Sequence, residues 1–192
     1  MFFDWEYHEP KGYISHRFSK GDIAFVQNRY RGMEWTCMVG RKLDFPIEGV
    51  DMCILLATKE AVWKCERYME RLLTDIRDVE TIIKRIGEIT EKDGRIEGGE
   101  LWIETKASTI AYRSIKDSTV FYRCSNLRKE KVWIGMNLNN FGRELSVSDR
   151  DFSMCKYKLV NELKTVASQC GREVNRLAKN LNILRKIQKV TS

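Results

Sequence analysis

Two apolar seams with strict three- and four-residue spacing constrain the fold of this chain more than any other feature. The first contains Val62, Cys65, Met69, Leu72, Ile76, Val79, Ile83 and Ile86. The second contains Val160, Leu163, Ala167, Cys170, Val174, Leu177, Leu181 and Leu184. Such spacing places one continuous face of a helix against a partner. The sequence therefore predicts two long helices whose distal turns pair with each other or with a second chain.

Capping and helix-breaking residues give the expected helix boundaries. Thr58 is typical of the residue that caps a helix N-terminus, and Asp93-Gly94 is typical of a helix end. The segment Ser148–Asp151 resembles a capping box, with Asp in place of the usual Glu. We therefore expect the first helix to follow Thr58 and the second to run from about Asp149 toward Val190.

Segments rich in aromatic and β-branched residues precede each predicted helix and are typical of strands. They are Tyr13–Phe18, Ile23–Tyr30, Met33–Arg41, Val50–Leu56, Leu101–Thr105, Thr109–Ile115, Thr119–Cys124 and Val132–Leu138. The order is four strands and a helix, repeated once. We therefore predict an α+β fold of two ββββα halves with two antiparallel sheets. Residues 1–192 are expected to form a single domain with pseudo-repeat halves 12–92 and 99–190.

The cysteine, histidine and glycine patterns exclude several classes of protein. No two of the six cysteines lie within four residues of each other, and only two histidines occur, so neither a zinc finger nor a histidine metal cage is expected. Nucleotide-binding glycine loops and the Gly-x-Ser-x-Gly elbow are also absent from the sequence. No secretory leader or apolar run of membrane length is visible. We predict an intracellular protein with no membrane contact, no metal and no cofactor.

The net charge of +7 comes from one end of the chain. The segment from Lys156 to Ser192 contains nine basic residues, which only Glu162 and Glu173 oppose, and the rest of the chain is neutral. A basic segment of this kind suits a phosphate-bearing partner, although a solvated helix face has the same pattern.

Basic and aromatic residues interleave on the predicted strands, which favours nucleic-acid binding. Sheets bind unpaired strands by stacking bases on aromatic rings while cations contact the phosphates. Trp35 is expected in the core because it shares a face with Cys37 and Val39, whereas Trp133 is predicted to face outward. The candidate binding residues are Arg17, Arg29, Tyr30, Arg41, Lys106, Tyr112, Arg113, Arg123, Arg128, Lys129, Lys131 and Trp133.

A second pattern favours a different chemistry. Asp93 is followed by the apolar segment that leads to Glu104-Thr-Lys106, which resembles the arrangement of metal-dependent nucleases of the restriction-enzyme type. In such sites two carboxylates hold Mg²⁺ and a lysine orients or activates water. Lys92 stands where those enzymes usually have a proline. Our main prediction is that the chain is not an enzyme, and a Mg²⁺-dependent nuclease is kept as an alternative.

Three stretches resemble the Whirly family, which includes plant single-stranded-DNA-binding proteins and mitochondrial guide-RNA-binding proteins. They are Val50–Cys65, Leu101–Tyr112 and Val132–Leu163. The first is similar to the last strand of the first half and its helix. The second is similar to the opening hairpin of the second half, and the third to the final strand and second helix. The resemblance implies two sheets packed against crossed helices, with single-stranded nucleic acid bound across the sheets.

Two functions of different classes follow from these patterns. The first is sequence-tolerant binding of single-stranded RNA or DNA through the sheet faces and the basic C-terminal helix. The second is an oligomeric structural or assembly protein held by coiled-coil helices. The long seams also predict a homo-oligomer, or a related partner chain bound through the helices.

Overall fold

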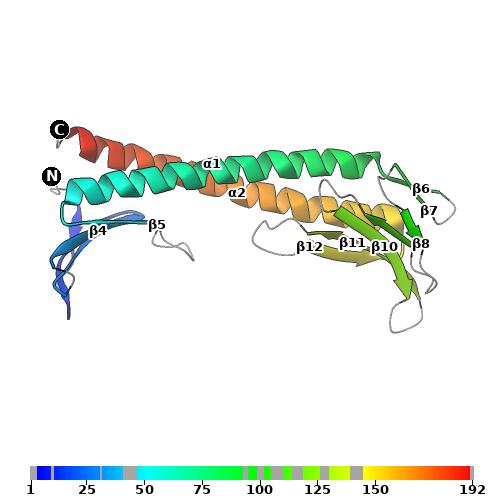
Figure 1. Cartoon of the computed structure of the whole chain (residues 1–192), viewed down its shortest axis with the longest axis horizontal. Coiled ribbons are helices and arrows are strands. Elements are labelled where there is room, and N and C mark those ends of the chain that lie inside the picture. The colour runs from blue at the N-terminus through cyan, green and yellow to red at the C-terminus, as the bar shows by residue number, and fades with distance from the viewer. Residues whose placement is uncertain are drawn as a thin grey trace. The chain divides into compact units, whose positions relative to one another are not determined.

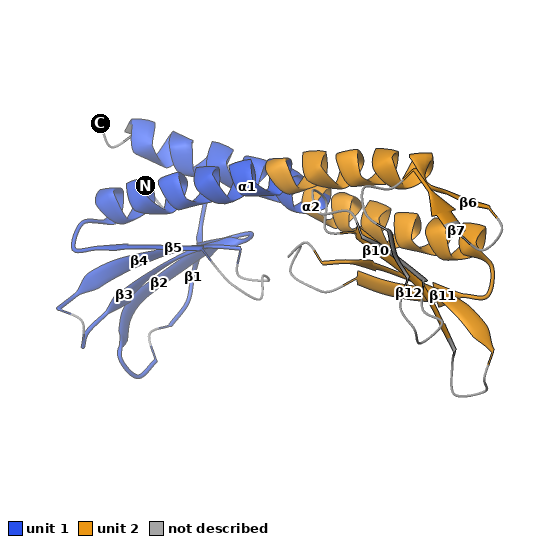
Figure 2. Cartoon of the chain, turned by 45° about the vertical axis from the view of Figure 1, so that its right-hand side comes forward, with its two compact units in different colours: residues 1–73, 172–192 blue, residues 74–171 orange. Residues whose placement is uncertain are grey.

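The chain has an α+β fold with two long helices and antiparallel sheets, as the sequence predicts (Figure 1). The computed structural model describes residues 4–9, 11–30, 32–40, 47–92, 95–98, 102–104, 110–113, 119–125, 130–138 and 145–190. The chain divides into two compact units (Figure 2). Unit 1 consists of Met1–Leu73 and Arg172–Ser192, and unit 2 consists of Thr74–Gly171. Helices α1 (Ile54–Glu88) and α2 (Phe152–Val190) contribute to both units.

Unit 1 contains a five-stranded antiparallel sheet in which the strands follow one another in chain order. Gly21 has a φ of 58° in the tight turn between the second and third strands, a conformation that glycine adopts without strain. The strands are β1 (Glu6–Tyr7), β2 (Ile14–Lys20), β3 (Ile23–Asn28), β4 (Glu34–Val39) and β5 (Ile47–Asp51).

One face of this sheet packs against α1. The register places Phe18, Phe25, Cys37 and Gly49 side by side across four strands. A Cβ atom at Gly49 would overlap the carbonyl oxygen of Ala57 in α1, so only glycine permits this close approach. The buried apolar side chains of the unit are Ile23, Ala24, Phe25, Cys37, Val39, Ala57, Ala61, Val62, Cys65, Leu72, Leu177, Leu181, Leu184 and Ile187.

Unit 2 contains a second five-stranded antiparallel sheet and a two-stranded ribbon. The sheet strands are again in chain order, from β8 at one edge to β12 at the other. The ribbon consists of β6 (Thr90–Lys92) and β7 (Arg95–Glu97). The sheet consists of β8 (Trp102–Glu104), β9 (Ile110–Arg113), β10 (Thr119–Ser125), β11 (Lys131–Asn137) and β12 (Leu145–Asp149).

In unit 2 the helix that packs on the sheet is α2. Phe152, in its first turn, contacts the rings of Phe121 and Trp133 at centroid distances of 5.3 and 5.0 Å. One turn later the Cys155 thiol donates to the Trp133 carbonyl oxygen at 3.6 Å. The core of this unit is Val79, Ile82, Ile86, Ile89, Ile96, Phe121, Trp133, Leu145, Phe152, Cys155, Leu159, Leu163 and Val166.

The two helices contact each other within one chain in both units. In unit 1 the Arg185 guanidinium donates to the Glu66 carboxylate at 2.6 Å. In unit 2 the Lys156 ammonium donates to the Ile89 carbonyl oxygen, just beyond the end of α1, at 2.7 Å. Of the two alternatives that the seams leave open, intrachain pairing is therefore the one present at these positions.

The structure corrects the predicted strand count and both predicted helix starts. Each large sheet has five strands rather than four, because β1 and β12 were not predicted. Helix α1 begins at Ile54, so Thr58 lies inside it and donates to the Ile54 carbonyl oxygen at 2.7 Å. Helix α2 begins at Phe152, and its cap is Asp151, whose carboxylate accepts the Met154 N–H at 2.8 Å.

The division into units does not follow the sequence halves, since each unit takes part of both helices. The single domain over residues 1–192 and the halves 12–92 and 99–190 stay predictions. Among the residues that the structure describes, neither helix has an 18-residue stretch apolar enough to cross a membrane.

Candidate nucleic-acid interface

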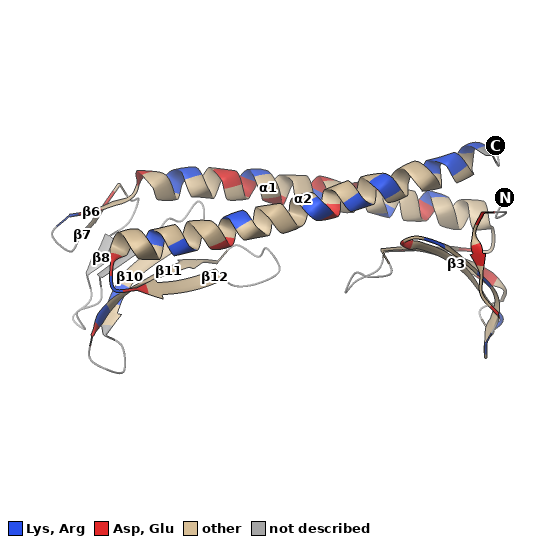
Figure 3. Ribbon diagram, turned by 180° about the vertical axis from the view of Figure 1, so that it is seen from behind, with Lys and Arg blue, Asp and Glu red and all other residues tan. Residues whose placement is uncertain are grey.

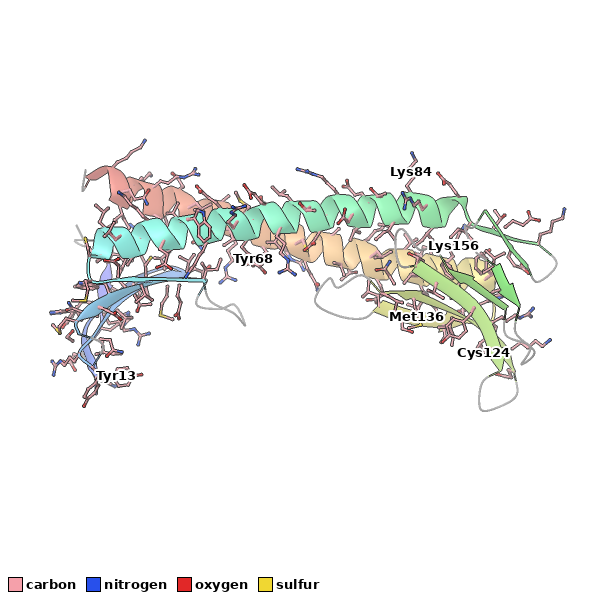
Figure 4. The ribbon with its side chains drawn as sticks, in the orientation of Figure 1. Tyr13, Tyr68, Lys84, Cys124, Met136 and Lys156 are labelled. Carbon is pink, nitrogen blue, oxygen red and sulfur yellow. The ribbon has the colours of Figure 1, made fainter. Side chains whose placement is uncertain are left out.

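Two tyrosines and an arginine meet at one end of the unit 1 sheet. Tyr13 precedes β2, while Arg29 and Tyr30 follow β3 directly. The Arg29 N–H donates to the Tyr13 carbonyl oxygen at 2.8 Å, which places the two tyrosines side by side with ring centroids 6.3 Å apart. Figure 4 shows Tyr13 projecting from the end of the sheet. We call Tyr13, Arg29 and Tyr30 the tyrosine tip.

Local hydrogen bonds, from side chains and from the backbone, hold the tyrosine tip in place. The Asn28 side chain accepts the Tyr30 N–H at 3.0 Å, and the Gln27 side chain donates to the Met33 carbonyl oxygen at 2.9 Å. Met33 itself has a φ of 69°, in the left-handed region, and its N–H bonds the Asn28 carbonyl oxygen. The turn that carries Tyr30 is therefore fixed by hydrogen bonds rather than by burial of its side chains.

Both rings of the tyrosine tip are exposed, and Tyr30 is more exposed than any other aromatic side chain that the structure describes. Tyr30 is 87% exposed and Tyr13 is 54% exposed, so neither ring adds much to the apolar core. Arg29 and the nearby Lys11 are also exposed. Exposed rings next to cations can stack on unpaired bases while the cations contact phosphates. The sequence predicted Arg29 and Tyr30 on a strand, whereas the structure places both in the turn after β3, and their role in binding stays a prediction.

Arg17 lies on the face of the unit 1 sheet that points away from α1. Its register neighbours on that face are Val26, Thr36 and Val50. The side chain is half-buried, and its Nε atom is buried without a hydrogen-bond partner among the described residues. An arginine in such a place keeps part of its donor capacity for a ligand.

Four of the nine basic residues in the C-terminal segment are committed to contacts inside the chain. Lys156 bonds the end of α1, and Lys158 pairs with Asp149 at 2.7 Å, which lowers the pKa of that carboxyl group. Arg185 pairs with Glu66. Arg176 pairs with Asp22 in the β2–β3 turn, whose carboxylate raises the pKa of the guanidinium. The other five are exposed and pair with no described residue: Lys164, Arg172, Lys179, Lys186 and Lys189.

In unit 2 the structure corrects the predicted orientation of Trp133. Its side chain is only 2% exposed and contacts Phe152, so it belongs to the core rather than to an outer surface. Arg123 pairs with Trp133 in the register, and its guanidinium lies 5.6 Å from the centroid of that ring. Arg123 is therefore half-buried beside the core and is not part of an open binding face. The error arose because the more apolar alternating set of β11, Val132, Ile134 and Met136, is the half-exposed one, whereas the set that contains Trp133 and Gly135 faces α2. Alternation alone would assign the apolar set to the inner face.

The opposite face of the unit 2 sheet is apolar on β10 and β11. Its half-exposed side chains are Val120, Tyr122, Cys124, Val132, Ile134 and Met136. These side chains include no cation, and the exposed Lys131 lies in the alternating set that contains Trp133. The absence of cations holds only for β10 and β11, because Arg113 of β9 pairs with Val120 and Ser146 and Ser148 of β12 pair with Met136 and Ile134 on this same face.

Several predicted residues cannot be placed in a site. Arg41, Lys106, Arg128 and Lys129 lie outside the described residues, and so does Asp93 of the nuclease pattern. Tyr112, Arg113 and Glu104 are described only as members of β9 and β8, where Tyr112 pairs with Phe121 and Arg113 with Val120. Among described side chains, no group of three or more could hold a metal ion. The Mg²⁺-dependent nuclease stays a prediction.

The outer edges of the two large sheets are closed by side chains from the following helix. In unit 1 the Lys64 ammonium donates to the Glu48 carbonyl oxygen at 2.8 Å, and the Glu60 carboxylate accepts the Val50 N–H at 2.8 Å. In unit 2 the Lys158 ammonium donates to the Ser148 carbonyl oxygen at 3.2 Å. Satisfied edge groups are poor templates for pairing with another strand. A ligand is thus expected at the tyrosine tip or on α2 rather than along β5 or β12.

Tyr13 was missing from the predicted binding residues, although it completes the tyrosine tip. The sequence showed it only as the start of a strand. Its place beside Tyr30 follows from the β2–β3 register, in which Ile14 pairs with Asn28. The pairing of Ile14 with Asn28 alone would have been enough to place Tyr13 beside Tyr30.

Comparison of the chain with protein families, with curated proteins and with solved structures gave no match. The resemblance to the Whirly family stays a prediction.

Proposed function

We propose that this protein binds single-stranded RNA or DNA with little sequence preference. The bases would stack on the tyrosine tip and the phosphates would meet the exposed cations of unit 1. The observation that carries the proposal is the pair of exposed tyrosine rings, 6.3 Å apart and next to Arg29. Every base has a π face, so such a site tolerates any sequence.

Known magnitudes support a useful affinity. Stacking of a base on an aromatic side chain is worth about 1–3 kcal/mol, so two rings would supply about 2–6 kcal/mol. Phosphate contacts would add a salt-dependent term. Four uncommitted cations of the C-terminal segment lie in unit 1, and together with Arg29 and Lys11 they are available for such contacts: Arg172, Lys179, Lys186 and Lys189. Stacking would favour unpaired strands, because bases in a duplex are already stacked on their neighbours.

The proposal places the binding surface on unit 1. The outer face of the unit 2 sheet is apolar on β10 and β11, and both Arg123 and Trp133 lie on the other face of that sheet. By contrast, Arg17 and the tyrosine tip belong to unit 1, as do the cations of residues 172–190. The sequence predicted binding through the faces of both sheets, and the proposal restricts it to the unit 1 sheet.

Fluorescence anisotropy with labelled single strands tests the proposal. DNA and RNA strands of about 30 nucleotides and a duplex control would be titrated between about 50 and 200 mM salt. The proposal predicts tighter binding of the single strands and a steep loss of affinity as salt rises. No binding at the lowest salt would contradict it. A parallel Mg²⁺ arm, resolved on a gel, would instead support the nuclease alternative if the probe were cleaved.

The assembly-protein alternative rests on the long seams. Buried seam residues such as Val62, Val79, Leu163 and Leu184 are already covered within the chain. A homo-oligomer held by the helices would therefore need another helix surface. Light scattering across a concentration series would test it, and a monomer that binds no nucleic acid would contradict both functions.

A further inference from the structure

The C-terminal part of α2 carries a continuous polar stripe. Figure 3 shows Lys and Arg recurring along this part of the helix. Its members are spaced three and four residues apart, and every one of them is exposed. We call them the α2 stripe: Arg172, Asn175, Lys179, Asn182, Lys186 and Lys189.

The α2 stripe lies on the far side of the helix from the buried seam. The seam in this part of α2 consists of Val174, Leu177, Leu181 and Leu184. With 3.6 residues per turn, the centres of the two sets are roughly 150° apart around the helix axis. The stripe runs for about 26 Å at 1.5 Å per residue. The packing that buries one face of α2 therefore leaves the stripe open along its whole length.

The charge of the α2 stripe is not compensated from within the chain. None of its four cations pairs with a described residue, whereas Arg176 and Arg185, which lie off the stripe, hold Asp22 and Glu66. Residues 172–192 contain only one acid, Glu173, which lies 3.9 Å from Arg176. The cations that form ion pairs within the chain therefore lie on a different side of the helix from the cations of the α2 stripe, which form one line.

We infer that the α2 stripe binds the phosphate backbone of a linear polyanion without reading bases. Lys and Arg would neutralise phosphates, and the Asn175 and Asn182 amides would donate to phosphate oxygens between them. The inference rests on the proposed function for its natural ligand, the bound strand. The stripe itself would bind a base-free phosphate chain equally well, because it contains no aromatic ring and its contacts are expected to be with phosphates.

Salt dependence gives the inference a quantity to measure. Each phosphate contact to a single strand contributes about −0.7 to the slope of log affinity against log salt. Four contacts would contribute about −2.8, which is about a 50-fold change in affinity between about 50 and 200 mM salt. Removing the stripe cations should abolish that part of the salt dependence and leave base stacking intact.

The test compares two variants with equal loss of charge. The stripe variant carries Arg172→Gln, Lys179→Gln, Lys186→Gln and Lys189→Gln. The control carries Lys59→Gln, Arg71→Gln, Arg77→Gln and Lys84→Gln, all exposed on α1, where acidic residues are interspersed. Circular dichroism would verify that both fold, and a labelled single strand and long-chain polyphosphate would serve as probes.

We expect the stripe variant to lose most of its polyphosphate binding and about 2.8 of the single-strand salt slope, while the control loses much less. Equal losses in both variants would overturn the inference, because net charge alone would then explain them. An unchanged salt slope in a stripe variant that still binds single strands would also overturn it, although the proposed function would stand. Stripe-dependent binding of polyphosphate by a chain that binds no nucleic acid would support the stripe and contradict the proposed function.

Discussion

The rings of Tyr13 and Tyr30 lie 6.3 Å apart between centroids although they belong to different turns of the unit 1 sheet. The backbone bond from Arg29 to Tyr13 fixes this spacing, and neither ring is covered by the core. Two adjacent aromatic rings that stay open to water keep apolar surface hydrated, so folding gains no hydrophobic free energy from that surface. A ligand with a flat apolar surface would gain that free energy on binding. Under the proposed function this ligand is a nucleobase, whose attached phosphates the neighbouring cations would contact.

Removing either ring of the tyrosine tip should weaken binding of single strands. Tyr13→Ala and Tyr30→Ala should each lower affinity by about 5- to 150-fold, since base stacking is worth about 1–3 kcal/mol. Duplex affinity should change little. Tyr157→Ala is a matched control, because Tyr157 is 60% exposed on α2 in unit 2. The same loss in the Tyr157 variant would show that the tip is not the stacking site.

Substitution of Gly49 by alanine should destabilise the protein, whereas the same substitution at Gly171 should stabilise it. A Cβ at Gly49 would lie 2.5 Å from the Ala61 nitrogen and overlap the Ala57 carbonyl, so Gly49→Ala should reduce the free energy of unfolding by about 3 kcal/mol or more. A Cβ at Gly171 meets nothing within 4 Å, and Gly171→Ala inside α2 should add about 1 kcal/mol. Urea denaturation of both variants measures the difference. A stable Gly49→Ala protein would mean that α1 does not pack this closely on β5.

Asn180 is a buried polar residue in the α2 half of the unit 1 core. It is 6% exposed, and its Nδ2 atom has no hydrogen-bond partner among the residues that the structure describes. An unsatisfied buried amide costs about 1–3 kcal/mol, so Asn180→Leu should raise the free energy of unfolding. Asn182→Leu, at an exposed position on the same helix, controls for the better helix propensity of leucine. A gain no larger than that of the control would indicate that Asn180 does find a partner.

The thiols should differ sharply in reactivity. Burial raises the pKa of Cys65 to about 12 and that of Cys155 to about 11, and it raises the pKa of Cys37 further still. These groups stay protonated and unreactive at about pH 8, whereas Cys53 is exposed. Iodoacetamide treatment followed by peptide mass spectrometry should label Cys53 in the native protein. Cys37, Cys65 and Cys155 should react only after denaturation, and their rapid labelling in native conditions would contradict the two packed cores.

The helices were predictable because the physical signal for them is redundant. Each seam contains eight apolar residues at alternating intervals of three and four, and side chains such as Leu72, Val79, Leu163 and Leu184 are buried as that pattern requires. The helix starts were less predictable, because each helix has more than one candidate cap. Asp51, whose carboxylate accepts the Cys53 N–H at 2.8 Å, precedes α1, although Thr58 matches the preferred residue type equally well, and Ser148 precedes Asp151 at the start of α2. Asp151 caps α2 although Ser148 begins a better-known capping pattern, since β12 extends through Ser148 to Asp149.

The binding surface was only partly predictable. Arg29 and Tyr30 follow directly from an exposed hairpin turn, which the sequence indicates by its Arg-Gly pair. Tyr13 depends on strand register, and Trp133 depends on which face of β11 meets α2. Alternation gives neither of them, because it does not fix the pairing of two strands and because the more apolar set of β11 is the half-exposed one. The sequence also could not show which C-terminal cations form ion pairs within the chain. Arg176 and Arg185 pair with Asp22 and Glu66, which lie far from them in the sequence.

The central claim is that unpaired bases stack on unit 1. The most direct test compares the affinity of the wild-type chain for three probes of equal length at one salt concentration, about 150 mM. The probes are a single strand, the same strand with its bases removed, and a duplex. The account predicts that the strand with bases binds at least tenfold more tightly than either of the other two. Equal affinity for all three, or no binding to any of them, would contradict it.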